Sequence, residues 1–160
     1  MTMDQLIAEF STTTENQCKA IFNTLFIVGN RLQTLFDSRI PELSLKQFML
    51  LSVARQSKEP MALTQLGELL GCSRQNVKKL AEALEKKGFV AIRQSPSDAR
   101  ALCLCPTQRG EDYFQGDFAA YAKELRSLFE VYTAQEIKTL FVLLSRMYAG
   151  IDRLEQKPTP

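Results

Sequence analysis

The chain has 160 residues, of which 45% are hydrophobic and 24% are charged, a composition typical of one globular domain or of a small domain with supporting helices. It contains no histidine, and its four cysteines lack C-x-x-C spacing, so we expect neither a metal site nor a disulfide framework. No apolar stretch approaches the roughly 18 residues that cross a bilayer, and the start MTMDQLIAEF does not resemble a signal peptide, so we expect a cytoplasmic protein.

The net charge of +2 is unevenly distributed along the chain. Residues 61–110 contain eight Lys or Arg and four Asp or Glu, a local net charge of +4, so the remainder carries −2. A basic segment within a nearly neutral chain is typical of a module that binds a polyanion, although solubility alone could also produce it.

Two helices are predicted in the first part of the chain. An apolar stripe predicts a long helix over residues 15–38, which ends before Pro41. Ser44 and Gln47 form a capping-box pattern that opens a second helix, predicted to end near Gln56.

A short helix is predicted to follow. Thr64 is expected to open it, and Gly71 is expected to provide a tight break after it. Its inward-facing residues are predicted to be Leu66, Leu69 and Leu70.

Residues 73–87, SRQNVKKLAEALEKK, predict a well-bounded amphipathic helix. Ser73 occupies an N-cap position, and Gly88 occupies the position of a left-handed C-cap. The spacing i, i+3, i+4, i+7 predicts that one face is buried, formed by Val77, Leu80, Ala81 and Leu84.

The next elements are strands and then helices again. Residues 89–93 and 100–105 are predicted to form two antiparallel strands around an exposed loop, 94–99. Thr107 is predicted to cap one helix that continues to Phe129, and Thr133 and Glu136 to open a last helix, which is apolar around most of its circumference.

This order predicts a mainly α fold with a small β-hairpin wing, that is, a winged helix-turn-helix flanked by long helices at both ends. The second helix of such a motif can enter the major groove of DNA with its N-terminal end. Arg74, Gln75 and Asn76 are the candidates for base contacts, because these side chains can pair bidentately with guanine or adenine. Lys78 and Lys79 are better suited to phosphates.

Residues 71–110 carry four motifs: S-R-x-x-V at the start of the helix, L-x-x-K-G-F-V at its end, P-x-D-x-R in the wing and T-x-x-G after it. Through these motifs the segment resembles the MarR family of bacterial transcriptional regulators. The long helices before and after this stretch suit the architecture of the family. The resemblance implies a homodimer that binds an inverted-repeat operator, each recognition helix in a major groove and each wing in the neighbouring minor groove.

Carried over by position, Arg100 is expected at the wing tip in the minor groove, oriented by Asp98. Ile92 and Ala99 depart from the family pattern, which often has arginine there, and so does Pro106, where leucine is usual. The predicted DNA-binding residues are Ser73, Arg74, Gln75, Asn76, Lys78, Lys79, Arg93, Asp98 and Arg100.

The resemblance also divides the chain into three parts. Residues 1–40 are expected to be an N-terminal helical dimerisation segment, 41–106 the winged helix-turn-helix and 107–160 the C-terminal dimerisation helices. Small aromatic effectors are expected between the DNA-binding lobe and the dimer helices, in a cleft lined by Phe22, Phe26, Phe48, Met49 and Phe114, although these residues can equally be core.

The leading hypothesis is therefore a dimeric, effector-responsive regulator that represses transcription. One alternative is redox sensing through Cys18, and another is a winged-helix protein-interaction module that does not bind DNA. An enzyme is disfavoured, because the chain has no histidine, no glycine-rich phosphate loop and no paired acidic or nucleophilic motif.

Overall fold

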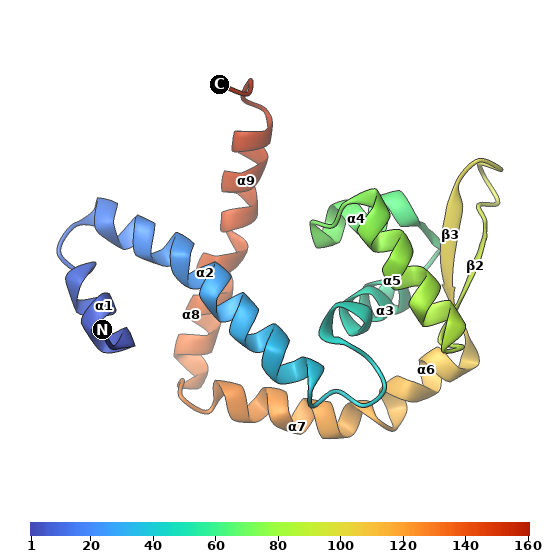
Figure 1. Ribbon diagram of the computed structural model, residues 1–160, viewed down its shortest axis with the longest axis horizontal. Helices are drawn as coiled ribbons and strands as arrows, with labels where there is room; N and C mark the ends of the chain where they lie inside the picture. The colour runs from blue at the N-terminus through green and yellow to red at the C-terminus, as the bar shows by residue number, and fades with distance from the viewer. The chain divides into compact units, whose positions relative to one another are not determined.

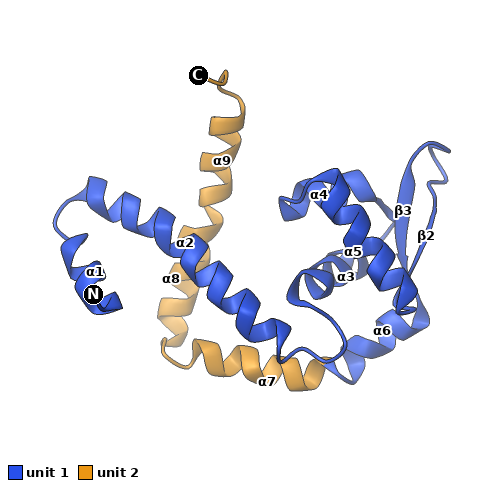
Figure 2. Cartoon of the chain, viewed as in Figure 1, with its two compact units in different colours: residues 1–117 blue, residues 118–160 orange.

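The computed structural model describes residues 1–160 as nine helices and one three-stranded antiparallel sheet (Figure 1). The elements in chain order are α1 (Met3–Glu9), α2 (Thr14–Asp37), α3 (Leu45–Gln56), β1 (Met61–Ala62), α4 (Leu63–Leu70), α5 (Arg74–Lys86), β2 (Val90–Gln94), β3 (Leu102–Pro106), α6 (Gln108–Gln115), α7 (Phe118–Phe129), α8 (Ala134–Ser145) and α9 (Met147–Glu155). The chain divides into two compact units, residues 1–117 and 118–160 (Figure 2).

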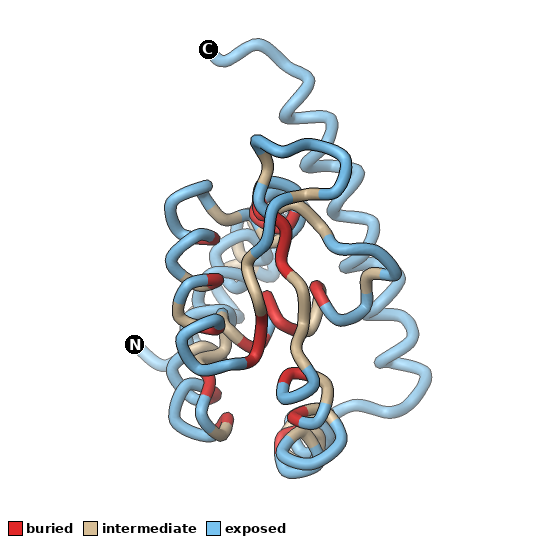
Figure 3. Tube along the Cα trace, turned by 90° about the vertical axis from the view of Figure 1, so that its right-hand side faces the viewer, coloured by how far each residue is buried: buried red, intermediate tan, exposed pale blue.

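The core of the first unit lies where α3, α4, α5 and β3 meet. These elements contribute the fully buried side chains Leu50, Leu51, Leu66, Leu84 and Leu104. Figure 3 shows this concentration of buried residues in the strands and the helices beside them. The fold is thus the mainly helical winged helix-turn-helix that the sequence predicts.

The sheet has the strand order β1-β3-β2. The β2–β3 hairpin has the predicted antiparallel pairing, with Ile92 opposite Leu104. The sequence did not predict β1, a strand of two residues in which Met61 pairs with Leu104 on the other side of β3. Because β1 directly precedes α4, this pairing attaches the start of α4 to the middle of β3, one of the two wing strands.

The predicted helix ends are largely confirmed by their caps. Ser44 and Gln47 form a reciprocal capping box at α3, and Thr133 and Glu136 form another at α8. Gly71 has a left-handed φ of 65° directly after α4, a conformation that glycine adopts without steric cost.

The prediction for α4 was wrong in two details. The helix begins at Leu63, with Ala62 as its N-cap, so Thr64 lies inside its first turn. Leu69 is 63% exposed, whereas Leu63 is buried. At about 100° per residue, the stripe of Leu63, Leu66 and Leu70 excludes Leu69, which projects to the side.

The two C-terminal helices expected from the sequence are each divided in two. The helix that begins after Thr107 ends at Gln115, because Gly116 leaves the helical region with φ −106° and ψ −81°. The last helix is interrupted at Arg146, whose carbonyl accepts a hydrogen bond from the Ala149 N–H, a 3₁₀-type bond that tightens the turn. The short N-terminal helix α1 was not predicted.

Large apolar side chains remain exposed on α2, α8 and α9. In the second unit every residue from 131 to 160 is exposed, and Phe141 and Tyr148 are 70% and 71% exposed. On α2, Phe22 and Phe26 are 62% and 59% exposed. Exposed apolar patches of this extent mark interaction surfaces. None of the nine helices combines the length and hydropathy needed to cross a membrane.

Candidate nucleic-acid interface

The N-terminal turns of α5 present polar side chains to solvent. The Ser73 hydroxyl accepts a hydrogen bond from the Asn76 N–H at 3.2 Å, which caps the helix as predicted. Val77, Ala81 and Leu84 are buried, and Leu80 of the predicted stripe is half-buried. This packing fixes the rotation of the helix, so the exposed residues of its first two turns are Arg74, Gln75, Asn76, Lys78 and Lys79.

The turn between α4 and α5 brings the two helices into close contact. The Cys72 N–H donates to the Gly67 carbonyl at 2.8 Å. A Cβ on Gly67 would lie 3.1 Å from the Cys72 carbonyl oxygen and 3.2 Å from Val77 Cγ1. The absence of a side chain at Gly67 therefore lets α5 pack directly on α4.

The wing loop is ordered by its own hydrogen bonds. The Ser95 N–H donates to the Ala101 carbonyl at 2.9 Å, which closes the loop. Inside it, Asp98 Oδ1 accepts from the Arg100 N–H at 2.9 Å, and the Asp98 carbonyl accepts from the Ala101 N–H at 3.0 Å. Asp98 thus orients the backbone of Arg100, and the Arg100 side chain is exposed.

The first turn of α5 and the loop end of the wing, residues 100–102, flank a pocket of about 220 Å³. Three of the predicted DNA-binding cations line it, Arg74 and Lys78 from the helix and Arg100 from the wing. Its apolar lining includes Leu63 and Val77. The structure therefore brings the helix and wing cations to one concave surface, whose chemistry suits a phosphate or another anion.

The remaining predicted cations lie apart from this pocket. Arg93 is exposed on β2 opposite Cys103, and Lys79 is exposed on α5. Lys78 Nζ lies 3.9 Å from Glu82, and an exposed pair of this kind contributes less than about 1 kcal/mol, so it does not hold the lysine in place.

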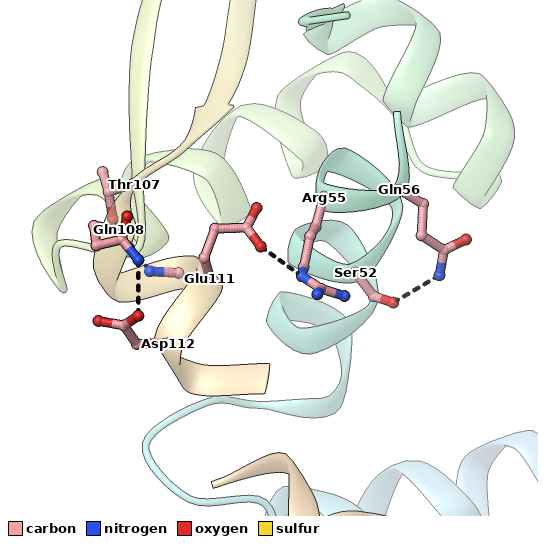
Figure 4. A network of polar contacts seen from close by, with 8 residues as sticks. Ser52, Arg55, Gln56, Thr107, Gln108, Glu111 and Asp112 are labelled. Atoms are coloured by element: carbon pink, nitrogen blue, oxygen red, sulfur yellow. Dashed lines mark hydrogen bonds and ion pairs between the residues drawn. The ribbon is translucent and has the colours of Figure 1, made fainter. Parts of the chain in front are cut away.

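Sequence reasoning missed the contacts that attach α6 to this unit. Arg55 of α3 donates to Glu111 of α6 at 2.7 Å (Figure 4), and its guanidinium lies 4.8 Å from the centroid of the Phe114 ring. Arg109 of α6 pairs with Glu42 at 3.2 Å and lies 4.7 Å from the Phe89 ring centroid. No local pattern could reveal these pairs, because their partners are more than fifty residues apart in the first case and sixty-seven in the second.

The candidate effector residues form two aromatic pairs. Phe22 and Phe26 stack edge to face on α2 with centroids 5.0 Å apart, and Phe48 of α3 lies 5.6 Å from Phe114 of α6. Met49 is 44% exposed. A single cleft lined by all five residues stays a prediction.

Cys18 is exposed on α2 and all four cysteines are free. It lines a depression of about 450 Å³ together with Phe10, Lys19, Phe22 and Asn23. Redox sensing at Cys18 also stays a prediction.

Comparisons with known proteins agree with this architecture. A sequence model of the MarR family matches residues 43–102, which include α3 to the start of β3. The transcriptional repressor MprA from Escherichia coli is 26% identical over 107 residues, which cover 67% of this chain and 61% of MprA. The chain spans less than two thirds of the length of the first curated relatives that it matches.

Solved structures extend the likeness beyond the winged segment. A probable transcriptional regulator from Pseudomonas aeruginosa is 26% identical with a TM-score of 0.70, and the match covers 79% of this chain and 96% of that one. BpsR from Bordetella bronchiseptica, whose DNA binding is regulated by 6-hydroxynicotinic acid, is 20% identical with a TM-score of 0.69 over 81% of this chain and 98% of its own, and shares the fold. Residues 43–102, which carry the helix-turn-helix and most of the wing, therefore match the MarR family, and the chain shares the fold of transcriptional regulators of this type.

Proposed function

We propose that the protein is a dimeric transcriptional regulator that binds DNA in a sequence-specific manner and responds to a small molecule. The observation that carries this proposal is the exposed row of Arg74, Gln75 and Asn76 at the capped start of α5. The opposite face of the same helix is buried in the core, so these three side chains have no packing role.

The chemistry of this surface matches a DNA groove. Arg74 can pair bidentately with guanine, and Gln75 or Asn76 with adenine, while the positive end of the helix dipole faces the phosphates. Lys79 adds a flexible positive charge beside the groove. Arg100 reaches the flanking minor groove from a loop whose hydrogen bonds already hold its backbone.

Exposed apolar surface supports the proposal of a dimer. Within the first unit α2 exposes apolar side chains such as Phe22, and within the second unit α8 and α9 expose others, such as Phe141 and Tyr148. A second copy related by a two-fold axis would remove this surface from water. Such a dimer would present two α5 helices to an inverted-repeat operator with half-sites about 10 bp apart, centre to centre.

A small aromatic acid is the proposed class of effector. Phe48 is buried, but the Phe114 ring that packs on it is half-buried, and the exposed Arg55 guanidinium lies over that ring. Arg55 Nε donates to Glu111, so an aromatic acid would pack against Phe114 and its carboxylate would pair with the terminal nitrogens of Arg55. The regulation of BpsR by 6-hydroxynicotinic acid is an example of this ligand chemistry. Repression is proposed as the mode of action, as in the repressor MprA.

Fluorescence anisotropy with labelled DNA tests the proposal. The parent protein should bind the region upstream of its own gene at least about a thousandfold more tightly than a scrambled duplex at physiological salt. Equal affinity for both duplexes would contradict sequence-specific binding.

Arg74→Ala, paired with Lys86→Ala as a control, locates the binding surface. Both substitutions remove one positive charge from α5, but Lys86 lies at the opposite end, about 18 Å along the helix axis. Arg74→Ala should weaken operator binding by roughly 1–3 kcal/mol, and Lys86→Ala should change it far less. Equal losses of operator affinity in the two variants would show that Arg74 contributes only its positive charge.

A further inference from the structure

One edge of β2 has no neighbouring strand. β3 lies between β1 and β2, so only one side of β2 is paired. The Ser95 N–H donates to the Ala101 carbonyl and the Thr107 N–H to the Phe89 carbonyl, which places odd-numbered residues of the 89–95 segment in the hydrogen-bonded pairs with β3. Residues alternate in an antiparallel ladder, so the N–H of Ile92 points away from β3, toward the edge without a neighbouring strand.

Glu85 occupies this edge. Its Oε2 accepts a hydrogen bond from the Ile92 N–H at 2.6 Å, from the last turn of α5. The carbonyl of the same residue accepts from the Gly88 N–H at 2.9 Å, within the turn that joins helix and strand. Glu85 therefore contacts the turn after α5 through its carbonyl and β2 through its side chain. A hydrogen bond to a carboxylate is stronger than one between neutral groups.

The bond lies where it can change the direction of the wing. The base of the hairpin is fixed by the buried Phe89 and Val90, whereas Ile92 is half-buried and the loop beyond it is largely exposed. From Ile92 to Ser97 the chain runs at most about 17 Å, because the strand itself ends at Gln94. A tilt of about 10° at Ile92 would therefore displace the tip by up to roughly 3 Å, a movement comparable to the length of a hydrogen bond.

We propose that Glu85 is a positioning residue for the wing: through the Ile92 N–H it sets the direction in which the hairpin carries Arg100 relative to the exposed row on α5. This inference rests on the proposed DNA-binding function, because its consequence is for operator binding. Glu85 itself contacts no DNA in this scheme. Its effect passes entirely through the wing.

Glu85→Ala and Glu85→Gln form a charge-matched pair. Both remove one negative charge, but the glutamine amide oxygen can still accept the Ile92 N–H. Glu85→Ala should bind the operator roughly threefold to tenfold more weakly than Glu85→Gln, at equal thermal unfolding temperature. Equal affinities of the two variants would overturn the proposal.

A double-mutant cycle with Arg100→Ala tests whether the effect passes through the wing tip. Once the Arg100 side chain is removed, Glu85→Ala should cost no further affinity relative to Glu85→Gln. An undiminished cost in the Arg100→Ala background would show that Glu85 acts elsewhere, and would overturn the assignment.

Amide hydrogen exchange tests the hydrogen bond without DNA. The Ile92 amide should exchange at least about tenfold faster in Glu85→Ala than in Glu85→Gln, while the Arg93 amide, which faces β3, should be unchanged. Unchanged exchange at Ile92 would overturn the inference. If the exchange changes as expected but the parent binds no DNA, the proposed function has failed and the helix-to-wing bond remains.

Discussion

Replacing Gly110 with alanine should destabilise the protein, although alanine is the better helix former. Gly110 lies in the first turn of α6, and a Cβ there would lie 2.4 Å from the Phe89 carbonyl oxygen. That oxygen already accepts the Thr107 N–H at 3.0 Å, so it cannot move without weakening the junction between the wing and α6. The backbone has to shift by about 1 Å to restore an ordinary van der Waals separation.

The expected cost follows from three contributions. Overpacking costs about 2 kcal/mol and the weakened Thr107–Phe89 hydrogen bond about 1 kcal/mol, while the gain in helix propensity offsets about 1 kcal/mol. The net loss of about 2 kcal/mol should lower Tm by roughly 4–8 °C for a chain of this length.

Two further alanine variants make the measurement a graded series. Gly67→Ala creates contacts of 3.1 and 3.2 Å, which a small movement can relieve, so it should cost less than about 1 kcal/mol. Gln115→Ala, on an exposed position of α6, should stay within about 0.5 kcal/mol of the parent. Circular dichroism melts at one protein concentration give the order of the melting temperatures of the three variants. If Gly110→Ala melts at or above the parent temperature, α6 does not dock on the Phe89 carbonyl.

Three other outcomes are expected. Asn76→Ala should cost roughly 1–3 kcal/mol on the operator and little on random DNA, measured by binding isotherms on both; an equal loss on both would exclude base readout. Lys79→Ala should weaken binding to both duplexes alike and should flatten the slope of log affinity against log salt by about one unit for each phosphate that is no longer neutralised. The control Lys86→Ala, two turns further along the same face of α5, should leave this slope unchanged. Phe141→Glu should convert a dimer into a monomer of 18.1 kDa in sedimentation velocity at micromolar concentration, and a parent that already sediments as the monomer would refute the dimer.

The elements that the sequence predicted well are those specified by neighbouring residues. Ser73 caps α5 through a hydrogen bond to a residue three positions away, and Gly88 adopts its left-handed φ of 81° immediately after the same helix. These interactions are local, so residue type and spacing suffice to predict them. The exposed row of predicted base-contacting residues follows from the same amphipathic pattern.

The features that were missed depend on contacts between distant residues or on small shifts in register. β1 exists because Met61 pairs with Leu104, a partner that no local pattern specifies. The error at Leu69 came from starting α4 after Leu63, which rotated the predicted buried face. The bond from Glu85 to the Ile92 N–H requires the geometry of the helix-to-strand turn, which spacing alone does not reveal.

The buried stripe of α5 also bears on how such a protein can change over evolutionary time. Val77, Ala81 and Leu84 hold the helix in one orientation, and none of them is among the outward-facing side chains. Substitutions in the outward set therefore alter what the helix can recognise while the free energy of unfolding stays nearly constant. If α5 reads DNA as proposed, a few exchanges at positions 74–76 in a duplicated copy of the gene would change the recognised sequence, and no stability would first have to be regained.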